Sequence, residues 1–368
     1  MAGVPEHQSG SDPAREPEYE VIGGVIDDQP SGLAAPKPPP DPSGGSGVLR
    51  VAAGEAWVNT RKSLSSWWFW MACMLGIAFA WGSAAGLVAW AESNSWFLAG
   101  AAGSTHMIMA AVLALAAAVL GAGWGFRHPE GRIPVLVLSG VIRGAALAVM
   151  AGASLLLVGL YDGGPAALAG VAVVVVVLEA ALFGLVGAGA RRCSTKVAPA
   201  AVLATVLVAF LCVGNVVLTI LILPATAGSD RMSVPVNVER DDSGRTISYL
   251  CVGELGPVNV EHTDRIAWLA TSNPVFILGS LGVDAASPNN ELGWLFLGLQ
   301  AAVDGPSREV PCLGGISRDG LAPPAPVALT GLAVQGVVAA LVLAAGHRLQ
   351  SRRVRVSSGG PVGARTRK

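Results

Sequence analysis

The feature that most constrains this chain is a series of six long apolar runs separated by polar connections. A helix needs about 20 apolar residues to cross the hydrocarbon core of a bilayer. It also satisfies its own backbone N–H and C=O groups, as a spanning segment must. The sequence therefore predicts an all-α polytopic membrane protein with six transmembrane helices. The runs cover residues 67–90, 105–124, 135–160, 167–190, 197–223 and 327–345.

The composition agrees with a membrane protein. Charged residues make up 13% of the chain, whereas soluble domains carry roughly 25%. Three tryptophans, Trp67, Trp68 and Trp70, begin the first run, and Trp90 ends it. Tryptophan gathers at both lipid–water interfaces, so these residues indicate where the first span enters and leaves the bilayer.

The basic residues predict an orientation. They occur at alternate connections, while 91–104 and 161–165 contain no Lys or Arg. Basic connections stay cytoplasmic, so we expect both termini in the cytoplasm, the protein in the cell membrane and residues 224–325 outside. The net charge of −1 gives no electrostatic reason to expect a nucleic-acid partner. The basic positions are Arg61, Lys62, Arg127, Arg132, Arg191, Arg192, Lys196, Arg348, Arg352, Arg353 and Arg355.

The remaining segments differ in character. Residues 1–46 are rich in Pro, Gly and Ser, a composition that cannot bury enough apolar surface to fold; a docking arm is the alternative. Residues 47–63 mix apolar and charged positions, as in a helix lying on the membrane, or continue the first span into water. The predicted organisation is a disordered cytoplasmic tail at 1–46, an interfacial helix at 47–63, spans one to five at 64–223, a loop domain at 224–325, span six at 326–347 and a basic cytoplasmic tail at 348–368.

We expect the long loop to form a small α/β-poor extracytoplasmic domain. Alternating stretches at 232–238 and 246–252 favour a few strands. The apolar run 292–299 is too short to span. Cys251 and Cys312 are the only cysteines of the loop, and both are predicted to lie on the oxidising side, where disulfides persist. We therefore predict a disulfide between them.

Two ionisable residues interrupt the apolar runs. Glu179 lies near the middle of the fourth run, and Arg143 lies about two turns into the third. A charge at the bilayer centre costs roughly 2.5–3.5 kcal/mol on insertion scales, so such residues face the bundle or water. They predict either a translocation path or an ion pair between spans three and four. The alternative is that Arg143 snorkels to the interface and Glu179 is a protonated packing residue.

The motifs of common enzymes do not appear in the sequence. A glycine-rich phosphate-binding loop followed by Lys and Ser/Thr is missing. The five histidines are scattered, without the spacing of metal ligands. We therefore expect no enzyme activity, cofactor or metal.

Four segments carry a resemblance to a known family. They are the stretch from Val48 to Glu55, the connection Pro129-Glu130-Gly131-Arg132-Ile133-Pro134, the stretch from Leu178 to Arg191-Arg192, and the segment from His262 to Asn273-Pro274 with its Trp268. Together with the topology they resemble the permease subunits of type II, six-span ATP-binding-cassette exporters, including actinobacterial members. In that family the first segment is an elbow helix and the second couples to the ATPase. The usual coupling motif is acidic-x-Gly-Thr-Leu, whereas here Glu130 directly precedes Gly131, with Arg132 in place of Thr.

The resemblance implies transport by alternating access in the membrane lipid. A separate ATPase subunit would dock on Glu130, Gly131 and Arg132, and the permease would pair with a second copy or with another permease. A different class stays open on the residues alone. The chain can instead be a membrane sensor or interaction protein whose outer loop binds a ligand or partner. An ATPase that co-purifies with the chain distinguishes the first reading from the second.

Overall fold

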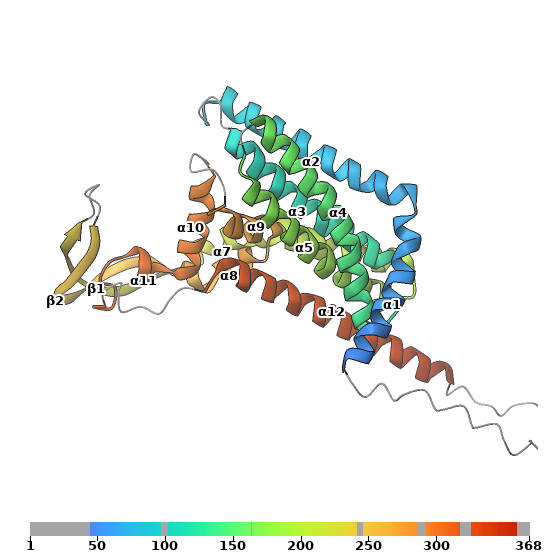
Figure 1. Cartoon of the computed structure of the whole chain (residues 1–368). Helices are drawn as coiled ribbons and strands as arrows, with labels where there is room; N and C mark the ends of the chain where they lie inside the picture. The colour runs from blue at the N-terminus through green and yellow to red at the C-terminus, as the bar shows by residue number, and fades with distance from the viewer. Residues whose placement is uncertain are drawn as a thin grey trace, which may run out of the picture. The chain divides into compact units, whose positions relative to one another are not determined.

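The computed structural model describes residues 45–96, 102–162, 164–240, 246–285, 292–316 and 325–358. Most of the predicted N-terminal tail, and residues 359–368 of the predicted C-terminal tail, lie outside these ranges. The part from Gly45 onward forms one compact unit. Six of its helices are long and apolar enough to cross a membrane, so the chain is a multi-pass membrane protein, as predicted (Figure 1).

The six long helices follow the predicted apolar runs. The fifth is interrupted by one π-helical turn at Phe210–Gly214. The sixth continues past its apolar part, so that residues predicted as the start of the basic tail are helical. The spans are α2 (Trp67–Ser93), α3 (Ala102–Arg127), α4 (Ile133–Asp162), α5 (Ala166–Cys193), α6 (Val197–Ala209) with α7 (Asn215–Ile222), and α12 (Val327–Ser358).

Helix α1 (Gly45–Leu64) is separate from α2. The two are divided at Ser66, whose backbone is extended. The buried face of α1 contains Ala52 and Ala56, which pack with Val135 at the start of α4. Another face, with Val51 and Val58 seven residues apart, is exposed. An apolar outer face on a helix that adjoins a span is typical of an interfacial helix.

Helix α5 is the centre of the bundle and contacts α3, α4, α6 and α12 (Figure 1). It packs through small residues. A Cβ added to Gly121 of α3 would overlap the carbonyl of Ala180, and one added to Gly125 would overlap the carbonyl of Gly184. On the α4 side, Gly144 approaches the same Ala180. Apolar burial gives little driving force inside a bilayer, so close approach of backbones is what holds spans together.

Gly125 and Gly123 of α3 allow a test of this packing, because only Gly125 faces a close backbone neighbour. Gly125→Val should destabilise the protein by about 1–3 kcal/mol, because the new side chain meets backbone that cannot yield. Gly123→Val should change stability by less than about 0.5 kcal/mol, since nothing lies within 4 Å of a Cβ at that position. Thermal unfolding of both variants in one detergent checks this, and equal losses would show that the α3–α5 contact is not close.

Two spans are peripheral. In the apolar windows of α2 and of α6–α7, only 22% and 11% of residues are buried, against 61% in α3. Large apolar side chains such as Leu75 and Leu221 are exposed on these helices. Their outer faces are therefore the surfaces left for lipid or for another membrane subunit.

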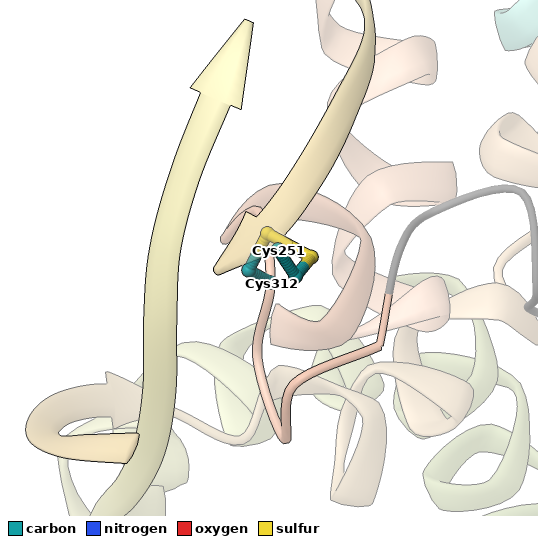
Figure 2. The surroundings of a disulfide bond; sticks show 2 residues. All are labelled: Cys251 and Cys312. Carbon is teal, nitrogen blue, oxygen red and sulfur yellow. A yellow bond between two sulfur atoms is a disulfide. The ribbon is translucent and has the colours of Figure 1, made fainter. Parts of the chain in front are cut away.

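Beyond the fifth span, a long antiparallel hairpin joins β1 (Ala227–Arg240) and β2 (Thr246–Glu261). Both strands are longer than the alternating stretches suggested. The structure places a disulfide between Cys251 of β2 and Cys312, which follows α11 (Pro306–Glu309), as Figure 2 shows. This bond ties the hairpin to the segment that leads back to the bundle.

After the hairpin, the described helices of the segment 224–325 pack against the spans. Short helices α8 (Ala267–Thr271) and α9 (Pro274–Gly282) contact α12, and α9 also contacts α3 and α5. Ile277 and Leu278 of α9 are buried in the same core as Met107 and Leu168 of the spans. Helix α10 (Gly293–Asp304), which contains the short apolar run, packs on α9. These helices are too short to span and bury their apolar residues against the spans instead.

Candidate functional site

The connection from α3 to α4, residues 128–132, is a turn that we call the elbow. It is a different segment from α1, which contains the elbow helix of the resemblance. Gly131 has a φ of +113°, a conformation that side-chain-bearing residues rarely adopt. Arg192, in the last turn of α5, donates from Nε to the Pro129 carbonyl at 2.8 Å and from Nη2 to the Gly131 carbonyl at 2.7 Å. The elbow is therefore hydrogen-bonded to the central helix of the bundle.

A cavity of about 510 Å³ lies beside the elbow, between α1, α3, α4 and α5. We call it the basic cavity. Four of its lining residues are charged: Lys62 of α1, Arg127 of α3, Glu130 of the elbow and Arg143 of α4. Lys62 and Arg127 are exposed, so the cavity reaches the molecular surface. We call this end of the bundle the basic end.

Arg143 is the inner residue of the basic cavity. Its side chain is buried, with only 3% of the residue exposed, and its Nε has no hydrogen-bond partner. It forms no ion pair with Glu179 or with any other residue in the described ranges. The structure thus brings Arg143, Glu130 and Gly131 to one cavity but does not pair the two intramembrane charges. Arg132 is exposed on the elbow.

The electrostatics of the cavity act on His128. Partial burial lowers the pKa of His128 below its usual 6.5, and the positive charges of Arg143 and Arg127 lower it further, while Glu130 opposes them. Protonation of His128 is therefore less favourable in the folded protein than in the unfolded chain. Between the folded pKa and 6.5 the unfolded state binds more protons, so acidification through this window lowers stability.

His128→Gln should reduce the loss of stability as pH falls from about 6.5 toward the lowered pKa. Thermal unfolding of the wild type and the variant across this window measures the difference. Arg127→Gln removes one of the opposing charges and should give a slope between the two. If the wild type and His128→Gln have identical slopes, His128 does not carry the effect.

Glu179 has a different environment from Arg143. It is fully buried, and its Oε1 and Oε2 accept hydrogen bonds from Nε2 of Gln335 on α12 at 3.2 and 3.1 Å. The same Nε2 donates to the carbonyl of Ser272 at 2.9 Å. One amide therefore joins α5, α12 and the turn between α8 and α9.

The turn between α8 and α9 also fixes the π-helical segment of the fifth span. A π-turn displaces the normal backbone ladder, and the Cys212 carbonyl accepts a bond from Nδ2 of Asn273 at 2.6 Å. Oδ1 of Asn273 caps α9 through the Val275 N–H. Asn215, after the π-turn, donates to the hydroxyl of Ser272 at 2.9 Å. The Asn-Pro segment noted in the sequence thus has a structural role.

The contact between Glu179 and Gln335 gives a test by double mutation. Gln335→Leu should destabilise the protein by about 3 kcal/mol, because it leaves buried oxygens of Glu179 and Ser272 without a donor. Adding Glu179→Leu should recover part of this loss, since removing both partners of a buried polar pair costs less than removing one. Unfolding in detergent measures the stability of the two single variants and of the double variant. If the losses of the two single variants simply add up in the double variant, Glu179 and Gln335 are not coupled.

Sequence reasoning missed two residues of these sites. Arg192 served as a topology signal and as part of the resemblance, but its bonds to the elbow were not predicted. Gln335 was not considered, although it is the only amide in the sixth apolar run. An amide in the middle of an apolar run needs a hydrogen-bond partner. This requirement could have predicted a polar contact at Gln335. In the described ranges, no cluster of three or more His, Cys, Asp or Glu residues is placed to hold a metal ion.

Comparisons of the chain with protein-family models, curated proteins and solved structures found no match. The resemblance to exporter permeases therefore stays a prediction from the topology and the quoted segments.

Proposed function

We propose that the chain is the permease subunit of an ATP-driven transporter, with its ATPase on a separate subunit that docks on the elbow. The observation that carries this proposal is the pair of hydrogen bonds from Arg192 to the elbow. Through them, a force applied to the elbow acts directly on the central helix α5. In this proposal the protein lies in the cell membrane with its basic end and both termini in the cytoplasm, and the positive-inside pattern of the sequence supports that orientation.

The surroundings of the elbow suit a docking protein. A second cavity, of about 600 Å³, lies against the elbow and is lined by Arg191, Arg192 and Arg353 as well as Glu130. Arg353 of α12 donates to the Cys193 carbonyl at the end of α5 at 2.7 Å. The ends of α5 and α12 are therefore linked to the elbow by hydrogen bonds, and the basic groups around them favour an acidic partner surface.

The packing of α5 suggests how a force would travel. Backbone contact with α3 and α4 leaves few side chains to absorb a displacement, so α5 would move as a rigid element. Its Glu179 is bonded to Gln335 of α12, and Gln335 to the turn before α9. A shift at the elbow could thus exchange two packed arrangements of the bundle, as alternating access requires. The substrate class is not defined by these contacts.

A transporter of this kind pairs two permeases around the path. The outer faces of α2 and α6–α7 are the large apolar surfaces that the chain does not bury itself. We propose that one of them contacts a second copy or another six-span chain, and that lipid covers the rest.

A second candidate function is favoured by the hairpin. The cross-strand pairs Val234–Val252 and Val236–Leu250 place four apolar side chains on one face, and all four are exposed. Exposed apolar patches mark interaction surfaces. If residues 224–325 lie outside the cell, a sensor or interaction protein would use this face to bind a partner.

Purification from native membranes in a mild detergent tests the first function. An ATP-binding-cassette ATPase should co-purify with the wild type. Glu130→Ala should reduce its recovery by about tenfold if Glu130 is a central contact. Glu254→Ala removes an exposed carboxylate on β2, far along the chain from the elbow, and should leave recovery unchanged.

Two outcomes would contradict the docking model. One is a folded wild-type protein that purifies without any ATPase. The other is equal ATPase recovery with Glu130→Ala and with the wild type. A partner that is lost instead with Val236→Asp would favour the interaction function of the hairpin.

A further inference from the structure

The basic cavity contains a buried charge without a counterion. Arg143 is 3% exposed, and its Nε has no partner. Buried charges are normally paired, because removing an ion from water costs several kcal/mol that only a partner offsets. No carboxylate in the described ranges lies within ion-pair distance of Arg143. The missing partner therefore has to come from outside these residues.

The other charged groups of the cavity add to its excess of positive charge. Lys62, Arg127 and Arg143 line it, against the single carboxylate of Glu130. Burial lowers the pKa of His128, and the positive charges of Arg143 and Arg127 lower it further. An anion that entered the cavity would meet three permanent cations contributed by three different helices.

The shape of the cavity indicates how such an anion is held. Its volume of about 510 Å³ lies within the usual range of ligand pockets, roughly 300–1,000 Å³. Arg143 is ten residues from the start of α4, roughly 15 Å along the helix axis at 1.5 Å per residue. Buried Trp124 and Leu136 supply apolar wall, and the α3–α5 contact at Gly125 and Gly184 lines the cavity with backbone.

We propose that the basic cavity binds a phosphate-bearing anion, held by Arg143 at its inner end and by Lys62 and Arg127 near its mouth. A guanidinium donates two parallel hydrogen bonds to phosphate oxygens. Phosphate suits the site better than a single carboxylate, because it offers more oxygens and more charge to three cations. Both a phospholipid headgroup and a water-soluble phosphate ester carry this chemistry. The proposal goes beyond transport and holds whether or not an ATPase binds the elbow.

Two measurements on the full chain separate the two sources. In the first, native mass spectrometry of protein purified in detergent with mixed phosphatidylcholine and phosphatidylglycerol measures which lipid is retained. In the second, calorimetry measures inorganic pyrophosphate binding to the protein in phosphatidylcholine nanodiscs. Preferential retention of phosphatidylglycerol assigns the site to a lipid headgroup, and pyrophosphate binding assigns it to a soluble phosphate ester.

Variants place the binding in the cavity. Arg143→Met should weaken the positive measurement roughly tenfold or more, because it removes charge-assisted hydrogen bonds. The protein should still fold, since the change removes an unpaired buried charge. The double variant Lys62→Gln/Arg127→Gln alters only exposed residues and should weaken binding similarly. Lys196→Gln removes an exposed charge of the same end outside the cavity and should bind as the wild type does.

Two results would overturn the proposal. The first is that folded wild-type protein neither prefers phosphatidylglycerol nor binds pyrophosphate. The second is that binding is equal in the wild type, in the Lys62/Arg127 double variant and in any folded Arg143→Met protein. If Arg143→Met does not fold, the double variant alone decides. Because neither measurement involves an ATPase, failure here is distinct from failure of the docking model.

Discussion

Direct backbone contact between α5 and its neighbours is the constraint on which the rest of the structure depends. In a bilayer, lipid tails solvate apolar side chains as well as a neighbouring helix does, so spans associate through close packing. Gly121 and Gly125 of α3 and Gly144 of α4 let those helices approach α5 without intervening side chains. This seam fixes the axis of α5, and α5 in turn positions Arg192 at one end and Glu179 near its middle. The basic cavity lies where the seam reaches the basic end.

The long helices could be predicted because the length and hydropathy of each apolar run depend only on the local sequence. The placement of α8 and α9 could not, since hydropathy reports that a segment avoids water but not which surface it packs against. Pro274–Gly282 is apolar and nine residues long, too short to span, and nothing in its sequence specifies burial beside Met107 and Leu168. The strands were recognised by alternation, but their ends depend on pairing between β1 and β2, which no single stretch encodes.

The candidate site shows the same division. Arg143 and Glu179 stood out because charges in apolar runs are costly, yet nothing in one sequence states the helix face each occupies. The partner of Glu179 is Gln335, 156 residues away, and only the packing of α12 on α5 brings them together. Arg192 belonged to a basic cluster with an adequate explanation in topology. Its bonds to the elbow depend on the carbonyl directions of Pro129 and Gly131, which follow from the backbone of the turn.

The two buried ionisable residues therefore have opposite relations to the fold. Glu179 accepts its hydrogen bonds from Gln335 of α12, so the pair links two helices. Replacing both residues by apolar ones would leave no unpaired polar group. Arg143 receives no hydrogen bond at Nε and no carboxylate from the described residues, although it too is buried. A charge that the fold does not neutralise persists at a stability cost unless something else neutralises it. The cavity that leads from Arg143 to exposed Lys62 and Arg127 gives that partner a route, which is why the unpaired arginine is better understood as half of a binding contact than as a packing defect.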